Sequence, residues 1–201
     1  HRDDAREAFP QINGRQVLLV VGRIDPHKNQ VWLVEQAPEI FHRHPRALLV
    51  LVGACTNEEY GRELRRRIEE SGLPNRIILT GGLPPADARL IGLYQDAAAV
   101  ILPSQSETFG LIILESWAAG APVISSRTSG ASSLIHHGRD GWLFDLHDPG
   151  PLHAAVDQAL LRPELARELA AIGRQRVGAE YDTGVTAGRM KALYDELIEE
   201  K

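Results

Sequence analysis

The sequence predicts an α/β fold, a doubly wound parallel sheet with helices on both faces. Short apolar runs alternate with longer segments of helical periodicity along most of the chain. The apolar runs lack a polar face, which is typical of strands buried on both sides of a parallel sheet. Sheets of this class bind ligands in the loops that follow the carboxyl ends of their strands. Each loop after a predicted strand is therefore a candidate site.

Each strand is predicted from a short apolar run between polar or turn-forming residues. The first run, at 17–21, contains only valine and leucine, and each later run except the last follows a helical segment. The predicted strands cover residues 16–22, 47–52, 77–80, 98–102, 123–125 and 142–144.

The helices are predicted from apolar residues that recur every three or four positions. Tyr60, Leu64 and Ile68 form one such series, and Gly72 follows them as a stop signal. Pro38 falls inside the first helical pattern and is expected to kink or shorten that helix. The predicted helices cover residues 30–42, 58–71, 85–96, 110–120, 151–161, 164–177 and 183–200.

The composition indicates one globular domain. The chain has 201 residues, of which 43% are hydrophobic and 24% charged, which is enough for a full core but short for two domains. Residues 1–15 are polar and mixed, so we expect them to be the end of a linker, and residues 16–201 to form the domain with its C-terminal helices. Because the chain begins with His1 rather than Met, we expect a piece of a longer protein or a processed chain.

Charge and composition argue against several classes of partner. The net charge of −5 disfavours nucleic acid, whose binding usually needs a basic surplus. No apolar stretch reaches transmembrane length, and no signal peptide opens the chain. The single cysteine, Cys55, rules out an intrachain disulfide and fits a reducing compartment. A cytoplasmic location is therefore expected.

The turn at residues 103–110 is the strongest candidate site. It follows one strand and precedes a helix, so the free N–H groups of the first helical turn are expected to form an anion site. Gly110 would let a ligand approach the backbone closely, and Thr108 is expected to cap the helix. Glu107 and Glu115 flank the turn with seven residues between them. Such carboxylates suit a ligand with hydroxyls as well as phosphates, but they are equally compatible with solvated surface acids.

The residues around this turn resemble a known motif. The motif consists of residues 106–111 (Ser-Glu-Thr-Phe-Gly-Leu), Glu115 and residues 118–124. It resembles the donor-binding motif of retaining nucleotide-sugar glycosyltransferases with the GT-B fold, which form glycosyltransferase family 4 or "group 1". The resemblance implies that the chain is the Rossmann-like C-terminal half of a GT-B enzyme, with both glutamates bordering the donor site. It also implies donor contacts by Ser104, Thr108, Phe109, Gly110 and Leu111.

A second motif follows the first predicted strand. Arg23 and Lys28 stand in one loop before a helix, where a planar guanidinium and a compact ammonium would suit a diphosphate. The alternative is a pair of ordinary surface cations. The loop resembles the family's Gly-Arg-x4-Lys-Asn element, whose Arg and Lys hold the donor diphosphate. The resemblance therefore adds Gly22, Arg23 and Lys28 to the expected site.

Three further loops carry weaker signals. Gly53 ends the second strand and would allow a close backbone approach. In the resembling family, the loop that corresponds to Leu83 contacts the nucleobase through backbone groups. The loop 127–133 is similar to the family's Gly-Gly-x-Pro-Glu loop, but serines replace its first Gly, its Pro and its Glu. This difference leaves Gly130 and the neighbouring amides as candidate donor contacts.

No metal or cofactor site is expected. The pairs His42/His44 and His136/His137 lack the spacing and the third ligand of a zinc site. The sequence has no Asp-x-Asp pair for a divalent cation, no Gly-x-Gly-x-x-Gly and no Gly-x4-Gly-Lys-Ser/Thr loop. These absences disfavour a dehydrogenase and a P-loop enzyme. The nucleoside-diphosphate sugar would be a substrate rather than a cofactor.

The resemblance implies transfer of a hexosyl group from a UDP- or GDP-hexose to a hydroxyl acceptor, with retention at the anomeric carbon. Arg23, Lys28 and Glu107 would be the catalytic residues, the two cations at the diphosphate and Glu107 at the hexose hydroxyls. Glu115 would bind the ribose. The acceptor site would belong to a missing amino-terminal domain, so this chain alone is expected to be inactive. That domain would also be the route to any peripheral attachment at the inner membrane.

Two alternatives from other classes stay open. A nucleotide-sugar epimerase of the same two-domain build would use similar loops, and a noncatalytic nucleotide-sugar binding module would need no acceptor domain. The residues do not specify the nucleobase, the hexose, the acceptor or the oligomeric state.

Overall fold

A six-stranded parallel sheet forms the centre of the molecule. The computed structural model describes residues 1–199, so the last residue of the predicted helix 183–200 lies outside the described residues. The strand order is β3-β2-β1-β4-β5-β6, and all five pairings are parallel. The predicted doubly wound α/β fold is confirmed. The strands are β1 (Gln16–Val21), β2 (Ala47–Val52), β3 (Ile77–Gly81), β4 (Ala97–Leu102), β5 (Val123–Ser126) and β6 (Trp142–Phe144).

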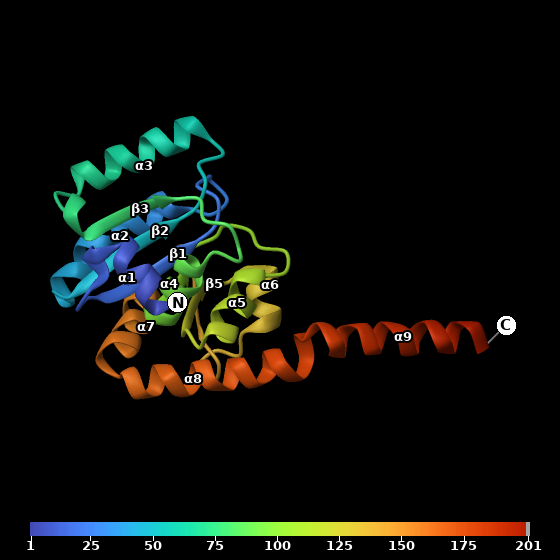
Figure 1. The fold of residues 1–201 in the computed structure, drawn as a ribbon. Coiled ribbons are helices and arrows are strands. Elements are labelled where there is room, and N and C mark those ends of the chain that lie inside the picture. Colours follow the sequence, from blue (N-terminus) through green and yellow to red (C-terminus); the bar gives the residue numbers. More distant parts are fainter. Residues whose placement is uncertain (200–201) are drawn as a thin grey trace.

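Helices cover both faces of this sheet, and Figure 1 shows α9 extending away from the body toward the right. A π-helical turn, Val177–Tyr181, joins α8 to α9. The helices are α1 (Arg2–Ala8), α2 (Gln30–Arg43), α3 (Glu58–Glu70), α4 (Ala88–Asp96), α5 (Leu111–Ala119), α6 (Ser129–Leu134), α7 (Gly150–Leu161), α8 (Pro163–Arg176) and α9 (Thr183–Glu199). In the part of the chain that the structure describes, no helix is long and apolar enough to cross a bilayer.

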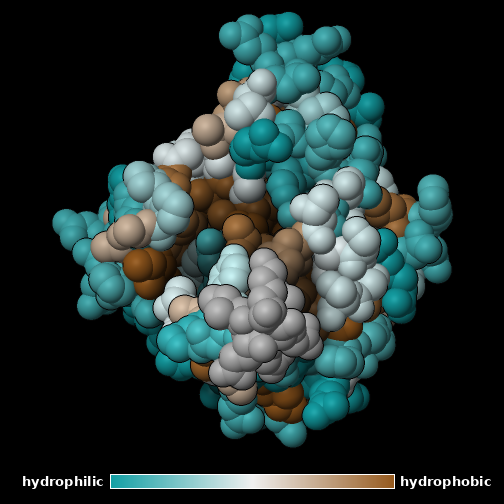
Figure 2. All heavy atoms as spheres, turned by 90° about the vertical axis from the view of Figure 1, so that its right-hand side faces the viewer, coloured by the Kyte–Doolittle hydropathy of each residue, from teal (hydrophilic) through white to brown (hydrophobic). Residues whose placement is uncertain are grey.

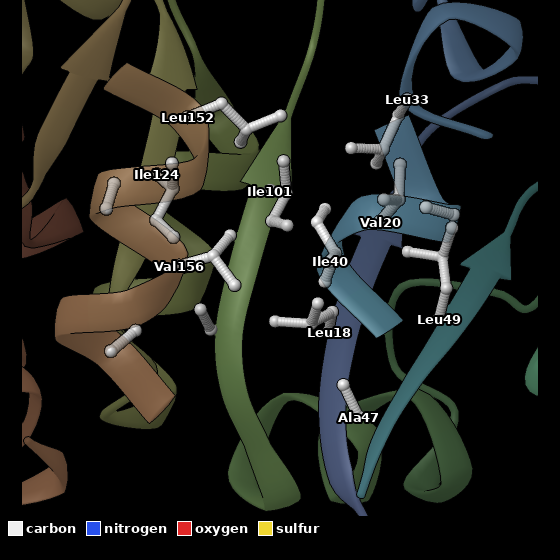
Figure 3. Packing of buried hydrophobic residues seen from close by; sticks show 14 of the residues in the cluster. Leu18, Val20, Leu33, Ile40, Ala47, Leu49, Ile101, Ile124, Leu152 and Val156 are labelled. Carbon is white, nitrogen blue, oxygen red and sulfur yellow. The ribbon is translucent and has the colours of Figure 1, made fainter. Parts of the chain in front are cut away.

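The strands bury side chains on both faces because successive residues of a strand point to opposite sides. In β1, Leu18 and Val20 pack with α2, α3 and α7, whereas Val17 and Leu19 pack with α4 and α5. Figure 3 shows the first of these two cores, where side chains of β1 and β4 face α2 and α7. Full burial of one such side chain contributes about 1.5–3 kcal/mol. The two cores therefore fix the strand edges from which the candidate loops emerge.

Residues 1–15 do not form the expected linker end. They contain α1, which packs against α4 through the fully buried Ala5. The approach is close, since a Cβ on Gly92 would lie 2.0 Å from the His1 carbonyl oxygen. Arg6 of α1 also forms an ion pair with Asp96, the last residue of α4, with 2.7 Å between Arg6 Nε and Asp96 Oδ2. Small residues at the contact and paired charges around it hold this polar segment on the domain.

Three local expectations are corrected. Gly110, with φ of 92°, is the N-cap residue of α5, so Thr108 is not the cap. The helix starts at Leu111 because a left-handed residue ends the preceding turn. Pro38 lies inside α2, which continues to Arg43, so of the two expected effects, a kink or a shortening, the shortening does not occur. The loop 127–133 contains the short helix α6, whose N-cap Thr128 accepts a hydrogen bond from the Ala131 N–H at 3.2 Å.

Candidate functional site

Three loops meet at the carboxyl ends of the central strands. They follow β1, β4 and β5, and hydrogen bonds join them directly. The Gln105 N–H donates to the His27 carbonyl at 2.8 Å, and the Gly130 N–H donates to the Glu107 carbonyl at 2.8 Å. Ser126 Oγ donates to the Ser104 carbonyl at 2.5 Å. The two loops that carry the sequence motifs are therefore brought together, as predicted from their places after parallel strands.

The face that carries these loops is hollowed. The loops lie toward the right in Figure 1, on the side from which α9 projects. Figure 2 looks onto that side and shows a hollow with apolar walls and hydrophilic margins. A concave surface of mixed polarity beside several loops is the usual setting of a small-molecule site.

An ion pair joins the two motifs at the centre of the site. Lys28 Nζ lies 2.5 Å from Glu107 Oε2, and the two side chains are only 18% and 16% exposed. The methylenes of Lys28 pass 3.4 Å from the place where a Cβ on Gly22 would stand, and Gly22 has φ of 150°. The backbone at position 22 would be strained with any other residue, and a Cβ there would contact the Lys28 stem.

Asp25 organises the other cation of the β1 loop. Arg23 is 65% exposed, and its Nε lies 3.3 Å from Asp25 Oδ2. The same carboxylate is buried and accepts the Lys28 N–H through Oδ1 at 3.1 Å. The buried Gln30 donates to the Arg23 carbonyl at 2.8 Å. Sequence reasoning missed Asp25, whose only signal is an acid next to a proline inside a loop with two cations.

The N-terminus of α5 lies in the same cluster of loops. Because α5 starts at Leu111, the N–H groups of its first turn have no carbonyl one turn earlier, and the helix dipole places partial positive charge there. Phe109 and Leu111 are 47% and 61% exposed, which is unusual for large apolar side chains beside a polar loop. Phe109 also packs edge-on against Tyr181, with the ring centroids 6.3 Å apart. The amides and these exposed side chains are available to a ligand.

Glu115 stands apart from this cluster. It lies one turn into α5, where its Oε2 accepts a hydrogen bond from the Tyr94 hydroxyl of α4 at 2.8 Å. The pKa of Tyr94 is raised mainly by burial and, to a smaller extent, by the Glu115 carboxylate. The phenol therefore stays protonated and remains a hydrogen-bond donor. Sequence reasoning missed Tyr94. The two side chains border a cavity of about 320 Å³ between α4 and α5, which is lined by Pro85, Ile91, Tyr94, Gln95, Glu115, Ala118 and Ala119.

Two of the predicted glycines have a packing role in the structure. A Cβ on Gly53 would lie 1.9 Å from the Gly22 carbonyl oxygen, and a Cβ on Gly130 would lie 2.8 Å from the Glu107 carbonyl oxygen. Each glycine therefore lets two site loops approach one another, whether or not a ligand is bound. Leu83 is half-buried and packs against the core on the α4 side of the sheet.

The loop after β2 lies against the loop that carries Arg23. The Ile24 N–H donates to the Ala54 carbonyl at 2.9 Å, and the Thr56 N–H donates to the Ile24 carbonyl at 3.3 Å. Cys55, between them, is exposed. Among the described residues, no group of three His, Cys, Asp or Glu side chains is placed to hold a metal ion.

A parallel sheet with cations and a helix N-terminus at its carboxyl edge is the architecture of the Rossmann-like half of a GT-B protein. The model of the family described as "Glycosyl transferases group 1" matches residues 1–176. The chain belongs to this family.

Curated relatives are similar over most of this chain. The chain is 36% identical over 160 residues to a D-inositol 3-phosphate glycosyltransferase from Acidothermus cellulolyticus, covering 75% of the chain and 35% of that protein. It is 32% identical over 202 residues to a D-inositol 3-phosphate glycosyltransferase from Catenulispora acidiphila, covering 98% and 47%. The chain thus spans less than half the length of these two relatives.

Solved structures share the fold. A sucrose-phosphate synthase from Thermosynechococcus elongatus matches with a TM-score of 0.84 and 29% identity, over 99% of this chain and 49% of that one. The Anabaena protein HepE, solved in complex with UDP and glucose, matches with a TM-score of 0.85 and 22% identity, over 96% and 52%. A C-terminal domain of a group 1 glycosyl transferase from Francisella tularensis matches over 93% of its length with a TM-score of 0.76. The chain therefore shares its fold with that C-terminal domain.

Proposed function

We propose that this chain is the donor-binding domain of a retaining glycosyltransferase that transfers a hexosyl group from a nucleoside-diphosphate hexose to a hydroxyl acceptor. The observation that carries the proposal is the Lys28–Glu107 ion pair, which joins the β1 loop that also carries Arg23 to the turn before the α5 N-terminus. A cation pair beside free amides suits a diphosphate, and an adjacent carboxylate suits sugar hydroxyls. Family membership and the UDP complex of HepE support the same assignment.

The proposed roles follow from where charge develops in the reaction. As the acceptor oxygen bonds to the anomeric carbon, the bond from that carbon to the diphosphate breaks, and a phosphate oxygen takes the acceptor proton. Negative charge then grows on the diphosphate. Arg23, Lys28 and the amides from Phe109 to Leu111 would stabilise it, and one preorganised donor of this kind is typically worth about 3–4 kcal/mol in the transition state. Glu107 would orient the hexose.

We place the nucleoside toward α4. Glu115 would accept hydrogen bonds from the ribose hydroxyls, held in position by Tyr94. Leu83, in the loop between β3 and α4, would lie against the base. No divalent cation is required in this scheme, because Arg23 and Lys28 supply the positive charge that a metal ion would otherwise provide. The acceptor would bind to a part of the protein beyond this chain, which spans less than half the length of the relatives described above.

Calorimetry tests the proposal on the 201-residue chain. UDP and GDP, each with its hexose conjugate, are titrated into the unaltered chain and into Arg23→Gln. We expect one of the two nucleotides to bind, with equal affinity in magnesium and in EDTA, and Arg23→Gln to weaken it by about tenfold, which is 1.4 kcal/mol. Arg167→Gln is the matched control, since Arg167 is 66% exposed on α8 and pairs with Glu164. Absence of binding for every ligand, or equal losses in both variants, would refute the assignment.

A further inference from the structure

We propose that Glu107 competes with the diphosphate for Lys28 and thereby makes the domain prefer a sugar-bearing donor over the free nucleoside diphosphate. This inference rests on the function proposed above and adds a basis for ligand selection at the same site. Among residues 1–199 the only ion-pair partner of Lys28 is Glu107. Arg23 is paired with Asp25 instead. The most buried cation of the site is therefore neutralised by a carboxylate of the protein itself.

The geometry makes the Lys28–Glu107 contact hard to bypass. The two charged atoms lie 2.5 Å apart with most of both side chains out of solvent, where charges are screened less than on an open surface. The Lys28 stem passes beside Gly22, which has no side chain to contact it. A phosphate that binds Lys28 must then approach the Glu107 carboxylate or displace it.

Displacement would involve the Glu107 side chain and leave its backbone in place. The Glu107 carbonyl accepts hydrogen bonds from the Gly130 N–H at 2.8 Å and from Ser129 Oγ at 3.2 Å. The neighbouring Gln105 N–H is bonded to the carbonyl of His27, one residue before Lys28. The two loops therefore stay joined while the carboxylate turns, so the cost of displacement depends on what the carboxylate meets next.

The two ligands differ at that point. Free nucleoside diphosphate takes Lys28 from Glu107 and offers the carboxylate no hydrogen-bond donor, so a partly buried negative charge is left facing another negative charge. A hexose on the terminal phosphate presents hydroxyl donors, and a carboxylate is an acceptor for them. The sugar thus compensates Glu107 for the loss of Lys28. Product left after transfer lacks that compensation and is released more readily.

The test compares UDP with UDP-glucose, or GDP with GDP-mannose if the chain prefers guanine, in the unaltered chain and in Glu107→Gln. Glutamine keeps the shape but removes the charge that competes for Lys28. We expect the plain diphosphate to bind about tenfold more tightly to Glu107→Gln, while the sugar conjugate binds with equal or lower affinity. Glu164→Gln, which removes a charge that is 84% exposed on α8, is expected to change neither affinity.

A second background separates competition from general repulsion. Glu107→Gln is also introduced into the Lys28→Gln variant. There it is expected to strengthen diphosphate binding by less than half of the free energy that it gains in the unaltered chain, because the ammonium for which Glu107 competes is already absent. Three outcomes would each overturn the inference. The gain in diphosphate affinity could be equal in both backgrounds, or Glu107→Gln could bind the diphosphate with unchanged or lower affinity. The third outcome is an equal gain in affinity for the diphosphate and for its sugar conjugate. Thermal unfolding of every variant confirms that it is folded. Failure of the unaltered chain to bind any nucleotide would refute the proposed function itself.

Discussion

At the scale of single residues, the site depends on partners that come from distant parts of the chain. Glu115 is exposed, yet its carboxylate is oriented by the phenol of Tyr94, which is only 4% exposed. The raised pKa of Tyr94 keeps this phenol protonated. Because a buried tyrosine has few alternative rotamers, we expect it to hold the carboxylate in one place. Tyr94 is therefore a positioning residue in the proposed ribose site.

Tyr94→Phe tests this role. The substitution keeps the ring and removes one hydrogen bond to a charged acceptor, which is typically worth about 1.5–3 kcal/mol. We expect the affinity for the plain nucleoside diphosphate to fall by about tenfold, with equal losses for its hexose conjugate, because the ribose is common to both. The measurement is calorimetry with both ligands. A loss confined to the sugar conjugate would place Glu115 at the hexose instead.

Element by element, the fold is most firmly joined where α8 crosses α5. A Cβ on Gly173 would lie 2.4 Å from the Trp117 ring, so only glycine lets the two helices approach this closely. The Trp117 indole N–H donates to the Asp140 carbonyl at 2.9 Å. Arg176, at the end of α8, lies 2.6 Å from the fully buried Asp140 carboxylate. This arrangement holds the C-terminal end of α8 close to α5, the helix whose N-terminus is the proposed anion site.

Asp140→Ala should therefore destabilise the domain markedly. Removing one partner of a buried ion pair leaves the other uncompensated, and a loss of about 3 kcal/mol in the free energy of unfolding is expected. Urea denaturation monitored by tryptophan fluorescence measures it. Glu164→Gln, which breaks only the solvated pair with Arg167, should change the same free energy by about 0–1 kcal/mol. Similar losses of unfolding free energy in the two variants would contradict the stabilising role assigned to Asp140.

At the scale of the whole molecule, the candidate site lies at one face of a single domain. Figure 2 shows a hollow on the side of the molecule from which α9 projects. The chain spans less than half the length of the two curated relatives described above. Under the proposed function, the acceptor therefore binds to a part of the protein beyond this chain.

We therefore expect the 201-residue chain to fold and bind a nucleoside diphosphate without transferring sugar. The double core on the two faces of the sheet gives it a cooperative unfolding transition of its own. Incubation with a radiolabelled UDP-hexose or GDP-hexose and simple glycoside acceptors should release no more product than a buffer control. Steady acceptor-dependent turnover would show that this chain contains a complete active site.

The sequence predicted the sheet well because most strands are almost wholly apolar and are followed by a helical pattern. The contact between the loop of Lys28 and the loop of Glu107 also followed, since parallel strands place their following loops at one edge. Tyr94 and Asp25 could not be predicted, because their roles depend on which side chains meet across separate elements. The helix α1 was missed because its buried contact consists of small residues, Ala5 and Gly92, that carry no amphipathic signal.

The exposed Cys55 makes this domain convenient to observe. It is the only cysteine in the chain, and its loop is hydrogen-bonded to the residue next to Arg23. A thiol-reactive fluorophore would attach at one known place, close to the proposed diphosphate site, without any substitution. Its emission should respond when a nucleotide alters the local field and solvent. The unmodified protein thus offers a built-in attachment point for an optical sensor of nucleotide sugars, suited to screening the hexose that the sequence does not specify.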